Sequence, residues 1–579
     1  MVEQDAPSRR RGLLADAGLL VFVAALGVKA GFGVAAVRDA DISDECYYLM
    51  SAVGVPERGL PAVEDAPLYV LWDYLLLKIG TPLEEVPVRS WAALAVLLPV
   101  ATFLLVRALG GGRLAALVAG GVIPATTLID IYPYPMHLAT VILVLGTALA
   151  ARLNRPAAGA VIGLTLLTVT FARPEFLYAL LLYLPPVAVL ALWALCRRPA
   201  MRRAVVASAV VFACGAALLV WAFGNPKGDG RRSFIAFGQH YAANRHDAGA
   251  RTENQWHYWE LYVRSDFGDV STVGGAWRSN REAFLWHLGA NVRRTPSVLR
   301  AVAAPRVDLW KLRSPQFTPP DAPTRHPTVE SLVRWLMLAG LASGLLGTAV
   351  GLRRLAQGRD EARRLPVALA MLAIVAAPAV AAVLLVYPRF HYLIPTVVFT
   401  TALAAAGFRH LPRPERLRGK AATRLALVAT VVALALVVPN RANGWCVQAK
   451  LGKARNGPKI ESTNTVIRSS VRTIRGLGLR PPVRVLEVGS ARAFYSGFGA
   501  GHVFPQTIPA GEGFLAFVQR ADIGLIVLEP VMAECPQLRD DPDFRALMDG
   551  KESARFRLVP VDGYPFLRVA ARRDLLPAE

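Results

Sequence analysis

Long apolar runs separated by short polar connections dominate the chain. Apolar stretches of roughly 17 to 25 residues, the length that crosses a bilayer as a helix, begin at about residues 13, 88, 113, 136, 156, 175, 203, 331, 366, 389 and 423. The first run lacks a small-residue cleavage site, so we expect it to be retained as a span. The pattern predicts an α-helical polytopic membrane protein with about 11 transmembrane helices.

Charge adds an orientation to this pattern. The 579 residues are 54% hydrophobic and 18% charged, with a mean hydropathy of +0.38 and a net charge of +23. Arginine and lysine concentrate in every second connection, at residues 9–11, 107–113, 152–155, 196–203, 351–364 and 408–424. Such charges stay cytoplasmic. We therefore expect a multi-pass protein of the plasma (inner) membrane with a cytoplasmic N-terminus, whose basic charge reflects topology and lipid contact, not nucleic-acid binding.

Three longer polar segments are then extracytoplasmic: residues 36–87, 224–330 and 440–579. In the last of these, β-branched runs at 483–489, 521–530, 556–562 and 566–572 alternate with polar pieces, which predicts a small C-terminal extracytoplasmic α/β domain after a transmembrane domain of residues 1–439. The motif VLEVGSARA lacks the later glycines of a dinucleotide loop. Cys446 and Cys535 share this oxidising side, where a disulfide between them is possible.

Two features of the outer loops suggest contact with the membrane surface. Residues 63–80 have an apolar face but carry charged residues that include Asp65, Asp73 and Lys78, so we expect a helix lying in the interface. The middle loop, which contains His240, interleaves aromatic residues with histidine and arginine. Aromatic residues there usually anchor a protein at the membrane surface, and carbohydrate stacking is the alternative.

The first outer loop carries an acidic cluster, DADISDECYYLM, at residues 39–50. Its four carboxylates fit three interpretations: a solvated loop, a site for a divalent cation, or a general base. A divalent cation is the one candidate cofactor. Asp39, Asp41 and Asp44 are each candidates for the residue that faces a cavity.

Several motifs, in order, resemble the GT-C superfamily of membrane glycosyltransferases. The resemblance is to the branch that includes protein O-mannosyltransferases and the lipid A aminoarabinose transferase, which is similar to glycosyltransferase family 39. It rests on Asp44 and Glu45 followed by Tyr48, on APLYVLWDYLLLKIG at 66–80, on GLTLLTVTFARPE at 163–175, and on YPRFHYLIP at 387–395. The lysine that some relatives carry before the proline pair is replaced here by EDAP.

The resemblance implies transfer of a sugar from a polyprenyl-phosphate donor to an acceptor hydroxyl on the extracytoplasmic face, with inversion. Asp44 would be the general base, with Glu45 and Asp41 beside it. The implied phosphate-binding residues are Arg389, Arg173, His391 and Tyr392. The implied cavity residues are Tyr48, Asp39, His137 and His240. The implied partners are membrane lipids and a glycan, lipid or protein acceptor of the cell envelope.

Other classes of protein share parts of this pattern. A lipid transporter or flippase normally places ionisable residues in mid-membrane, where these apolar runs have almost none. A lipid-linked oligosaccharide polymerase or ligase differs only in its donor. A receptor or scaffold would rely on the C-terminal domain and leave the acidic cluster without a chemical role.

Overall fold

The computed structural model describes most of the chain. The described residues are 6–37, 39–40, 44–130, 134–251, 253–256, 258–303, 327–358, 364–412, 419–438, 440, 466–489, 491–498, 501–509, 511–551 and 553–577. Asp41 and Cys446 fall outside these ranges, so the role predicted for Asp41 and the disulfide predicted for Cys446 lie outside the described residues. Cys535, the other half of that pair, is buried as a free thiol.

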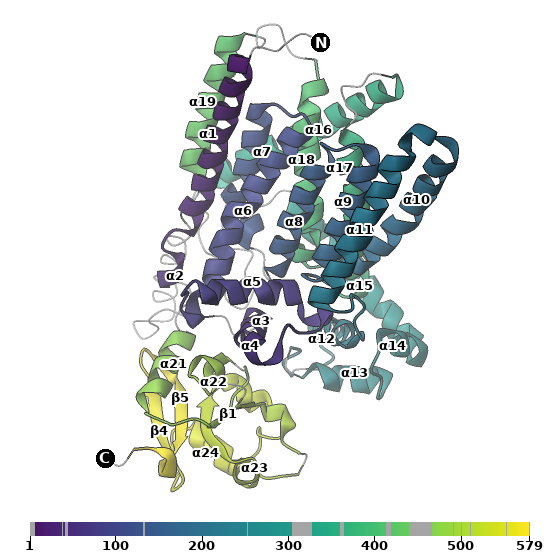
Figure 1. Cartoon of the computed structure of the whole chain (residues 1–579). Coiled ribbons are helices and arrows are strands. Elements are labelled where there is room, and N and C mark those ends of the chain that lie inside the picture. Colours follow the sequence, from purple (N-terminus) through teal and green to yellow (C-terminus); the bar gives the residue numbers. More distant parts are fainter. Residues whose placement is uncertain are drawn as a thin grey trace.

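Each predicted apolar run is a helix of one bundle (Figure 1). These helices are α1 (Ala6–Gly31), α6 (Val86–Ala108), α7 (Arg113–Ala125), α8 (Pro135–Ala150), α9 (Arg155–Thr170), α10 (Phe176–Arg197), α11 (Arg202–Phe223), α16 (Pro327–Ala356), α17 (Leu365–Leu385), α18 (Ile394–Gly407) and α19 (Lys420–Val437). Among described residues, 6 helices are long and apolar enough to cross a membrane, and four more are apolar but shorter. The number of spans stays a prediction.

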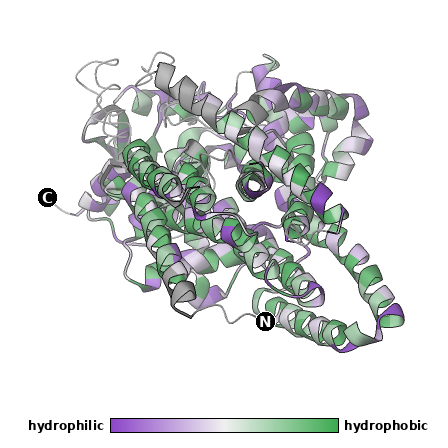
Figure 2. Cartoon of the chain, turned by 90° about the horizontal axis from the view of Figure 1, so that it is seen from above, coloured by the Kyte–Doolittle hydropathy of each residue, from purple (hydrophilic) through white to green (hydrophobic). Residues whose placement is uncertain are grey.

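Apolar residues cover the bundle helices, as the view from above shows (Figure 2). On α10 and α11 many of them face outward. Leu181, Leu190, Val210 and Leu218 are each more than half exposed. Water would penalise such a surface, whereas lipid tails would not. The exposed faces of these two helices therefore suit a bilayer.

Small residues let several bundle helices approach closely. A Cβ on Gly27 of α1 would lie 2.5 Å from the carbonyl oxygen of Ala95 in α6. Where α16 crosses α18, a Cβ on Gly344 would lie 2.4 Å from the carbonyl oxygen of Ala404. Neither position tolerates a side chain without a backbone shift. Close packing through small residues is the usual way membrane helices associate.

The basic connections gather at the N-terminal end of the bundle. Asp16 of α1 pairs with Arg107 at 2.9 Å and Arg113 at 2.6 Å, and Arg409 donates to the carbonyl of Gly110 at 2.9 Å. The three longer polar segments lie at the opposite end, which we call the tail end (Figure 1). Basic connections and the longer polar segments thus lie at opposite ends of the bundle, as their alternation along the chain predicts. The side of the membrane that each end faces stays a prediction.

Further helices, most of them short, cover the tail end of the bundle. They are α2 (Val34–Val37), α3 (Asp44–Val53), α4 (Val55–Arg58), α5 (Pro67–Lys78), α12 (Arg231–Asp247), α13 (Trp259–Phe267), α14 (Val273–Ser279) and α15 (Arg281–Ala303). The helix predicted within residues 63–80 is α5, which lies across the ends of the bundle helices (Figure 1). It packs between α3 and α6 and so supports α3 from the bundle side.

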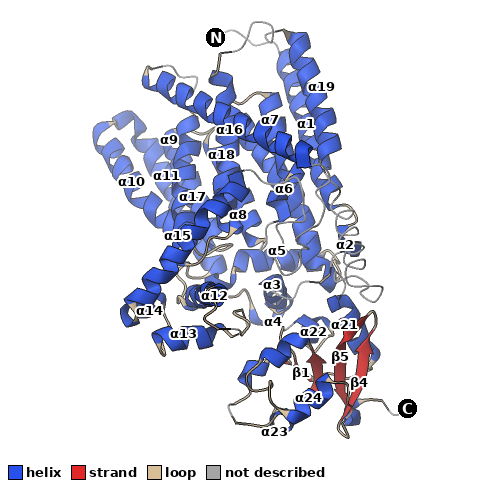
Figure 3. Ribbon diagram, turned by 180° about the vertical axis from the view of Figure 1, so that it is seen from behind, coloured by secondary structure: helices blue, strands red, loops and turns tan. Residues whose placement is uncertain are grey.

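The C-terminal segment forms a five-stranded sheet in the order β2-β1-β3-β5-β4 (Figure 3). Its strands are β1 (Arg484–Leu486), β2 (His502–Val503), β3 (Ile523–Leu528), β4 (Phe556–Val561) and β5 (Tyr564–Arg572), accompanied by α21 (Val466–Gly476), α22 (Ala491–Tyr495), α23 (Phe514–Arg520) and α24 (Pro542–Met548). The sheet is parallel from β2 to β3 and antiparallel from β3 to β4. The four predicted runs are strands, and β2 was not predicted. The boundary at residue 440 stays a prediction.

Candidate functional site

The two carboxylates that begin α3 have different surroundings. Glu45 is fully buried, and it accepts hydrogen bonds from the Tyr69 hydroxyl at 2.5 Å and from the backbone N–H of Tyr134 at 2.9 Å. Asp44 is only partly buried, and among the described residues its carboxylate has no hydrogen-bond or ion-pair partner. Glu45 therefore fixes α3 to the bundle, whereas Asp44 is free to bind or react.

Arg232, at the start of α12, lies within electrostatic range of Asp44. Its Nη2 donates to the Tyr48 hydroxyl at 2.5 Å, and its guanidinium lies 5.1 Å from the centre of the Tyr48 ring. Its Nη1 donates to the backbone carbonyl of Glu64 at 2.9 Å. Burial raises the pKa of Tyr48 to about 12, so the phenol stays protonated, and the charge of Asp44 acts on both Tyr48 and Arg232. Sequence reasoning missed Arg232, whose only local signal is the pair of arginines at the helix start.

Arg173 comes from the connection between α9 and α10. Its guanidinium pairs with Glu175 at 2.6 Å and lies 5.9 Å from the ring centre of Tyr392, which belongs to the short 3-10 helix η7 (Phe390–Leu393) before α18. The sequences ARPE and YPRFHYLIP thus meet in space. Because Glu175 already neutralises Arg173, this arginine offers less net positive charge than its number of N–H groups suggests.

Arg389 is half-buried and differs from Arg173 in its partners. Its guanidinium lies 5.0 Å from the ring centre of Trp256, a cation–π contact, and among the described residues it has no carboxylate partner. His240 of α12 packs against the same Trp256 ring with 5.4 Å between centroids. Burial and the Arg389 charge hold the pKa of His240 well below its ordinary value, so this imidazole is neutral.

His240 presents one nitrogen without a partner. Its Nδ1 lies 2.5 Å from the carbonyl oxygen of Ala236. Since a carbonyl only accepts, Nδ1 carries the proton and Nε2 has a lone pair. Among described residues this buried Nε2 has no hydrogen-bond partner. The nitrogen is therefore suited to accept a hydrogen bond from a bound molecule.

Most of the predicted site residues meet in one cluster at the tail end. Tyr392 lies within electrostatic range of Arg173, Arg389 and Asp44, and His391 within range of Arg173, Arg389 and His240. We call this group the Asp44–Arg389 cluster; its members are Asp44, Tyr48, Arg173, Arg232, His240, Arg389, His391 and Tyr392. His137 lies beneath it, within range of His391, with Nε2 3.0 Å from the carbonyl oxygen of Leu128.

Asp39, which we predicted as a cavity residue, is placed elsewhere. Its carboxylate accepts hydrogen bonds from the backbone N–H groups of Ile467 at 2.7 Å and Arg468 at 3.0 Å, the second and third residues of α21. These are donors that a helix N-terminus leaves free, and a carboxylate satisfies them well. Asp39 thus contacts the C-terminal domain and does not join the Asp44–Arg389 cluster.

A divalent cation remains a prediction. Among the described residues, no group of three or more histidine, cysteine, aspartate or glutamate side chains is arranged to hold a metal ion.

Asp73 of α5 is buried, and neither of its carboxylate oxygens has a hydrogen-bond partner in the described part of the chain. Burial and the nearby Glu45 raise the pKa of Asp73 well above its ordinary value. The Asp73 carboxyl group therefore keeps its proton to a higher pH than an ordinary aspartate does.

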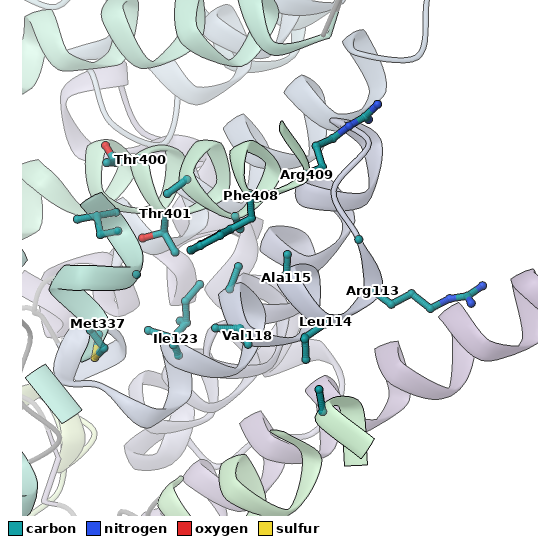
Figure 4. A pocket seen from close by; sticks show the side chains of 18 of the residues that line it. Arg113, Leu114, Ala115, Val118, Ile123, Met337, Thr400, Thr401, Phe408 and Arg409 are labelled. Carbon is teal, nitrogen blue, oxygen red and sulfur yellow. The ribbon is translucent and has the colours of Figure 1, made fainter. Parts of the chain in front are cut away.

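An apolar cavity of about 1310 Å³ lies between α7, α16, α18 and α19 (Figure 4). Val118 and Ile123 of α7 face Thr401 of α18 and Phe408, the residue that follows α18, across it. Towards the tail end it reaches Leu128, whose carbonyl contacts His137. The cavity therefore extends from Arg113 and Arg409, at the basic end of the bundle, to Leu128, whose contact His137 lies within electrostatic range of His391 of the cluster.

A second, polar cavity of about 530 Å³ adjoins the cluster. It lies between residues 60–65 and 222–231, and its charged lining residues are Glu64, Asp65, Lys227, Asp229 and Arg231. Asp65 Oδ1 is 3.4 Å from Nη1 of Arg232, which joins this cavity to the cluster. Polar molecules thus have room beside the residues that surround Asp44.

Comparison with known proteins gives weak similarity to solved structures. No protein-family model and no curated protein matches the sequence. Among solved structures, the crystal structure of ArnT from Cupriavidus metallidurans bound to undecaprenyl phosphate is 13% identical, with a TM-score of 0.46, and the alignment covers 97% of this chain and 99% of that chain. A similarity of this degree does not establish a family for the chain.

Proposed function

We propose that the protein is a membrane glycosyltransferase of the GT-C type, in the branch that the sequence motifs resemble, which transfers a sugar from a polyprenyl-phosphate donor to an acceptor hydroxyl. One observation supports this most directly. Asp44 has no partner among the described residues, Arg389 has no carboxylate partner there, and both lie within electrostatic range of Tyr392. A free carboxylate and a free guanidinium are the base and the phosphate-binding cation that such a transfer needs.

Arg389 is our choice for the donor phosphate because the other two arginines are engaged. Arg173 pairs with Glu175, and Arg232 is bound to Tyr48 and to the backbone of Glu64. A guanidinium binds phosphate through two parallel N–H bonds, and this contact strengthens as negative charge develops on the leaving phosphate. We assign Arg173, His391 and Tyr392 to the surroundings of the same phosphate.

A lipid-linked donor suits the surfaces around the cluster. The apolar cavity of about 1310 Å³ reaches Leu128, whose carbonyl contacts His137. An isoprenoid chain in that cavity would remove apolar surface from contact with water, at roughly 25 cal/mol per Å². The phosphate end of such a lipid would then be near the tail end, where the arginines gather.

The proposed reaction is a direct displacement. The acceptor hydroxyl oxygen bonds to the anomeric carbon, the bond from that carbon to the phosphate oxygen breaks, and the hydroxyl proton passes to Asp44. Polyprenyl phosphate leaves, and the configuration at the anomeric carbon inverts. We propose that the acceptor approaches from the polar cavity beside Arg232, and that the tail end is extracytoplasmic.

The test is a transfer assay with purified protein in lipid vesicles. Radiolabelled pentoses and hexoses on polyprenyl phosphate would be offered with glycan, lipid and peptide acceptors. We expect transfer from at least one donor, and its loss in Asp44→Asn. Absence of transfer from every donor, together with movement of a fluorescent polyprenyl phosphate between the two leaflets, would contradict the proposal and favour a flippase.

A further inference from the structure

Helix α3 is held on two sides by two different parts of the protein. Residues Glu45 and Tyr48 face the bundle, where they contact Tyr69. Cys46 and Leu49 lie on another face and pack in a buried apolar cluster with residues of the C-terminal domain: Ile467, Val471, Ala491, Phe494 and Tyr495. Residues three positions apart share one helix face, so the sequence DECYYL builds one face for each neighbour. The position of Asp44 therefore depends on both contacts.

The segment just before α3 is also fixed to the C-terminal domain. Asp39 caps α21 through the N–H groups of Ile467 and Arg468, and the Arg468 guanidinium donates back to the carbonyl of Ala35 at 2.8 Å. A further contact joins Arg475 of α21 to Glu84, before α6, at 2.8 Å. Asp39 is only five residues before Asp44. The hydrogen bonds from Asp39 to α21 therefore limit how far the start of α3 can move.

The same domain also holds the other side of the cluster. Tyr258 and Leu261, from the middle loop, pack in the apolar core of the C-terminal domain around Phe514. The Tyr258 hydroxyl shares a side-chain hydrogen bond with Cys535. Two residues earlier, Trp256 lies under the guanidinium of Arg389. The domain thus contacts the segments on both sides of the Asp44–Arg389 cluster.

From these contacts we propose that the C-terminal domain is a clamp that positions α3, and with it Asp44, relative to Arg389, and that Asp39 is the main positioning residue of this clamp. The predicted effect of the clamp on sugar transfer rests on the proposed function. The predicted effect on the position of α3 is independent of that function. A general base acts only within hydrogen-bond reach of its proton, so a small shift of α3 has a large effect on rate.

The test compares two aspartates that cap helices of the same domain. Asp39→Ala removes the cap of α21. Asp541→Ala removes the cap of α24, where Asp541 accepts from the N–H groups of Asp543 and Phe544, and it also removes the bond from the Phe514 N–H at 2.9 Å. Asp541→Ala thus perturbs the same domain without touching α3. Asp39→Asn keeps one acceptor oxygen and provides a milder variant should Asp39→Ala fail to accumulate. Hydrogen exchange of backbone amides is measured by mass spectrometry on the full chain in lipid vesicles.

We expect amides of residues 44–53 to exchange about tenfold faster in Asp39→Ala, within the range expected for a lost cap, with α6 and α8 unchanged. Asp541→Ala should leave α3 unchanged. Turnover should fall by about 10- to 100-fold in Asp39→Ala with an unchanged donor KM, because binding through Arg389 persists. Unchanged exchange in α3 would overturn the clamp. Faster exchange of α3 in Asp39→Ala, together with a wild type that transfers no sugar, would instead support the clamp and refute the proposed function.

Discussion

Replacing Asp44 by asparagine separates chemistry from structure in this site. Asn keeps the size of the side chain but removes its basicity. Because Asp44 makes no hydrogen bond or ion pair to another described residue, the change breaks no such contact. We expect the free energy of unfolding to change by no more than about 0.5 kcal/mol, as for a neutral surface substitution. Loss of a positioned base costs about 10²- to 10⁴-fold in rate, or about 2.7 to 5.5 kcal/mol of transition-state stabilisation.

The matched control is Glu45→Gln, one residue further along. Glu45 accepts from both Tyr69 and the Tyr134 N–H, and a glutamine has only one accepting oxygen. We expect this variant to lose about 1.5 to 3 kcal/mol of stability, the range for a hydrogen bond to a charged group. The two variants should thus differ in kind, one losing activity and the other losing stability.

Transfer of radiolabelled sugar and thermal unfolding, both in the same vesicles, would measure these effects. Donor affinity of Asp44→Asn should stay near that of the wild type, since the carboxylate does not bind the phosphate. If Asp44→Asn keeps more than about a tenth of the wild-type transfer rate, it lies outside the range for a lost base and the assignment is wrong. Inactivity of Asp41→Asn with an active Asp44→Asn would keep the reaction and change the residue.

Arg389→Lys should raise the donor Kd although charge is kept, because an ammonium lacks the guanidinium fork; an unchanged Kd in donor titrations would move the phosphate site elsewhere. Asp73→Asn should fold as well as the wild type at pH 5. Burial raises the folded-state pKa of Asp73, so the wild type loses stability as pH rises from the ordinary carboxyl pKa of about 4 to that raised folded-state pKa, and the variant does not. Thermal unfolding should favour the variant increasingly over this window, and parallel pH profiles would contradict the raised pKa. Ala248→Cys and Gln506→Cys should react with an impermeant maleimide in intact cells while Gln357→Cys does not, and protection of the first two would refute the predicted topology.

The sequence by itself determined the bundle helices and four of the five strands. Apolar runs of bilayer length need no partner to become helical in lipid, because a helix satisfies its own backbone groups. The β-branched runs after residue 480 likewise matched β1, β3, β4 and β5. The tail-end location of the three longer polar segments followed from alternation of basic connections. These features depend on the local sequence or on the order of segments along the chain, and not on tertiary contacts.

The partners of each charged side chain were decided only by the tertiary structure. Asp39 and Asp44 are indistinguishable in the acidic run, yet one caps α21, more than 400 residues away, and the other has no partner among the described residues. Arg232 belongs to the cluster only because the middle loop folds back on α3. The Arg232 guanidinium then contacts the Tyr48 ring. Hydrogen bonds and ion pairs depend on distances of about 3 Å. Segments far apart in the sequence reach such distances only when the whole bundle packs, which is why the sequence named the residue types of the site and the fold assigned their roles.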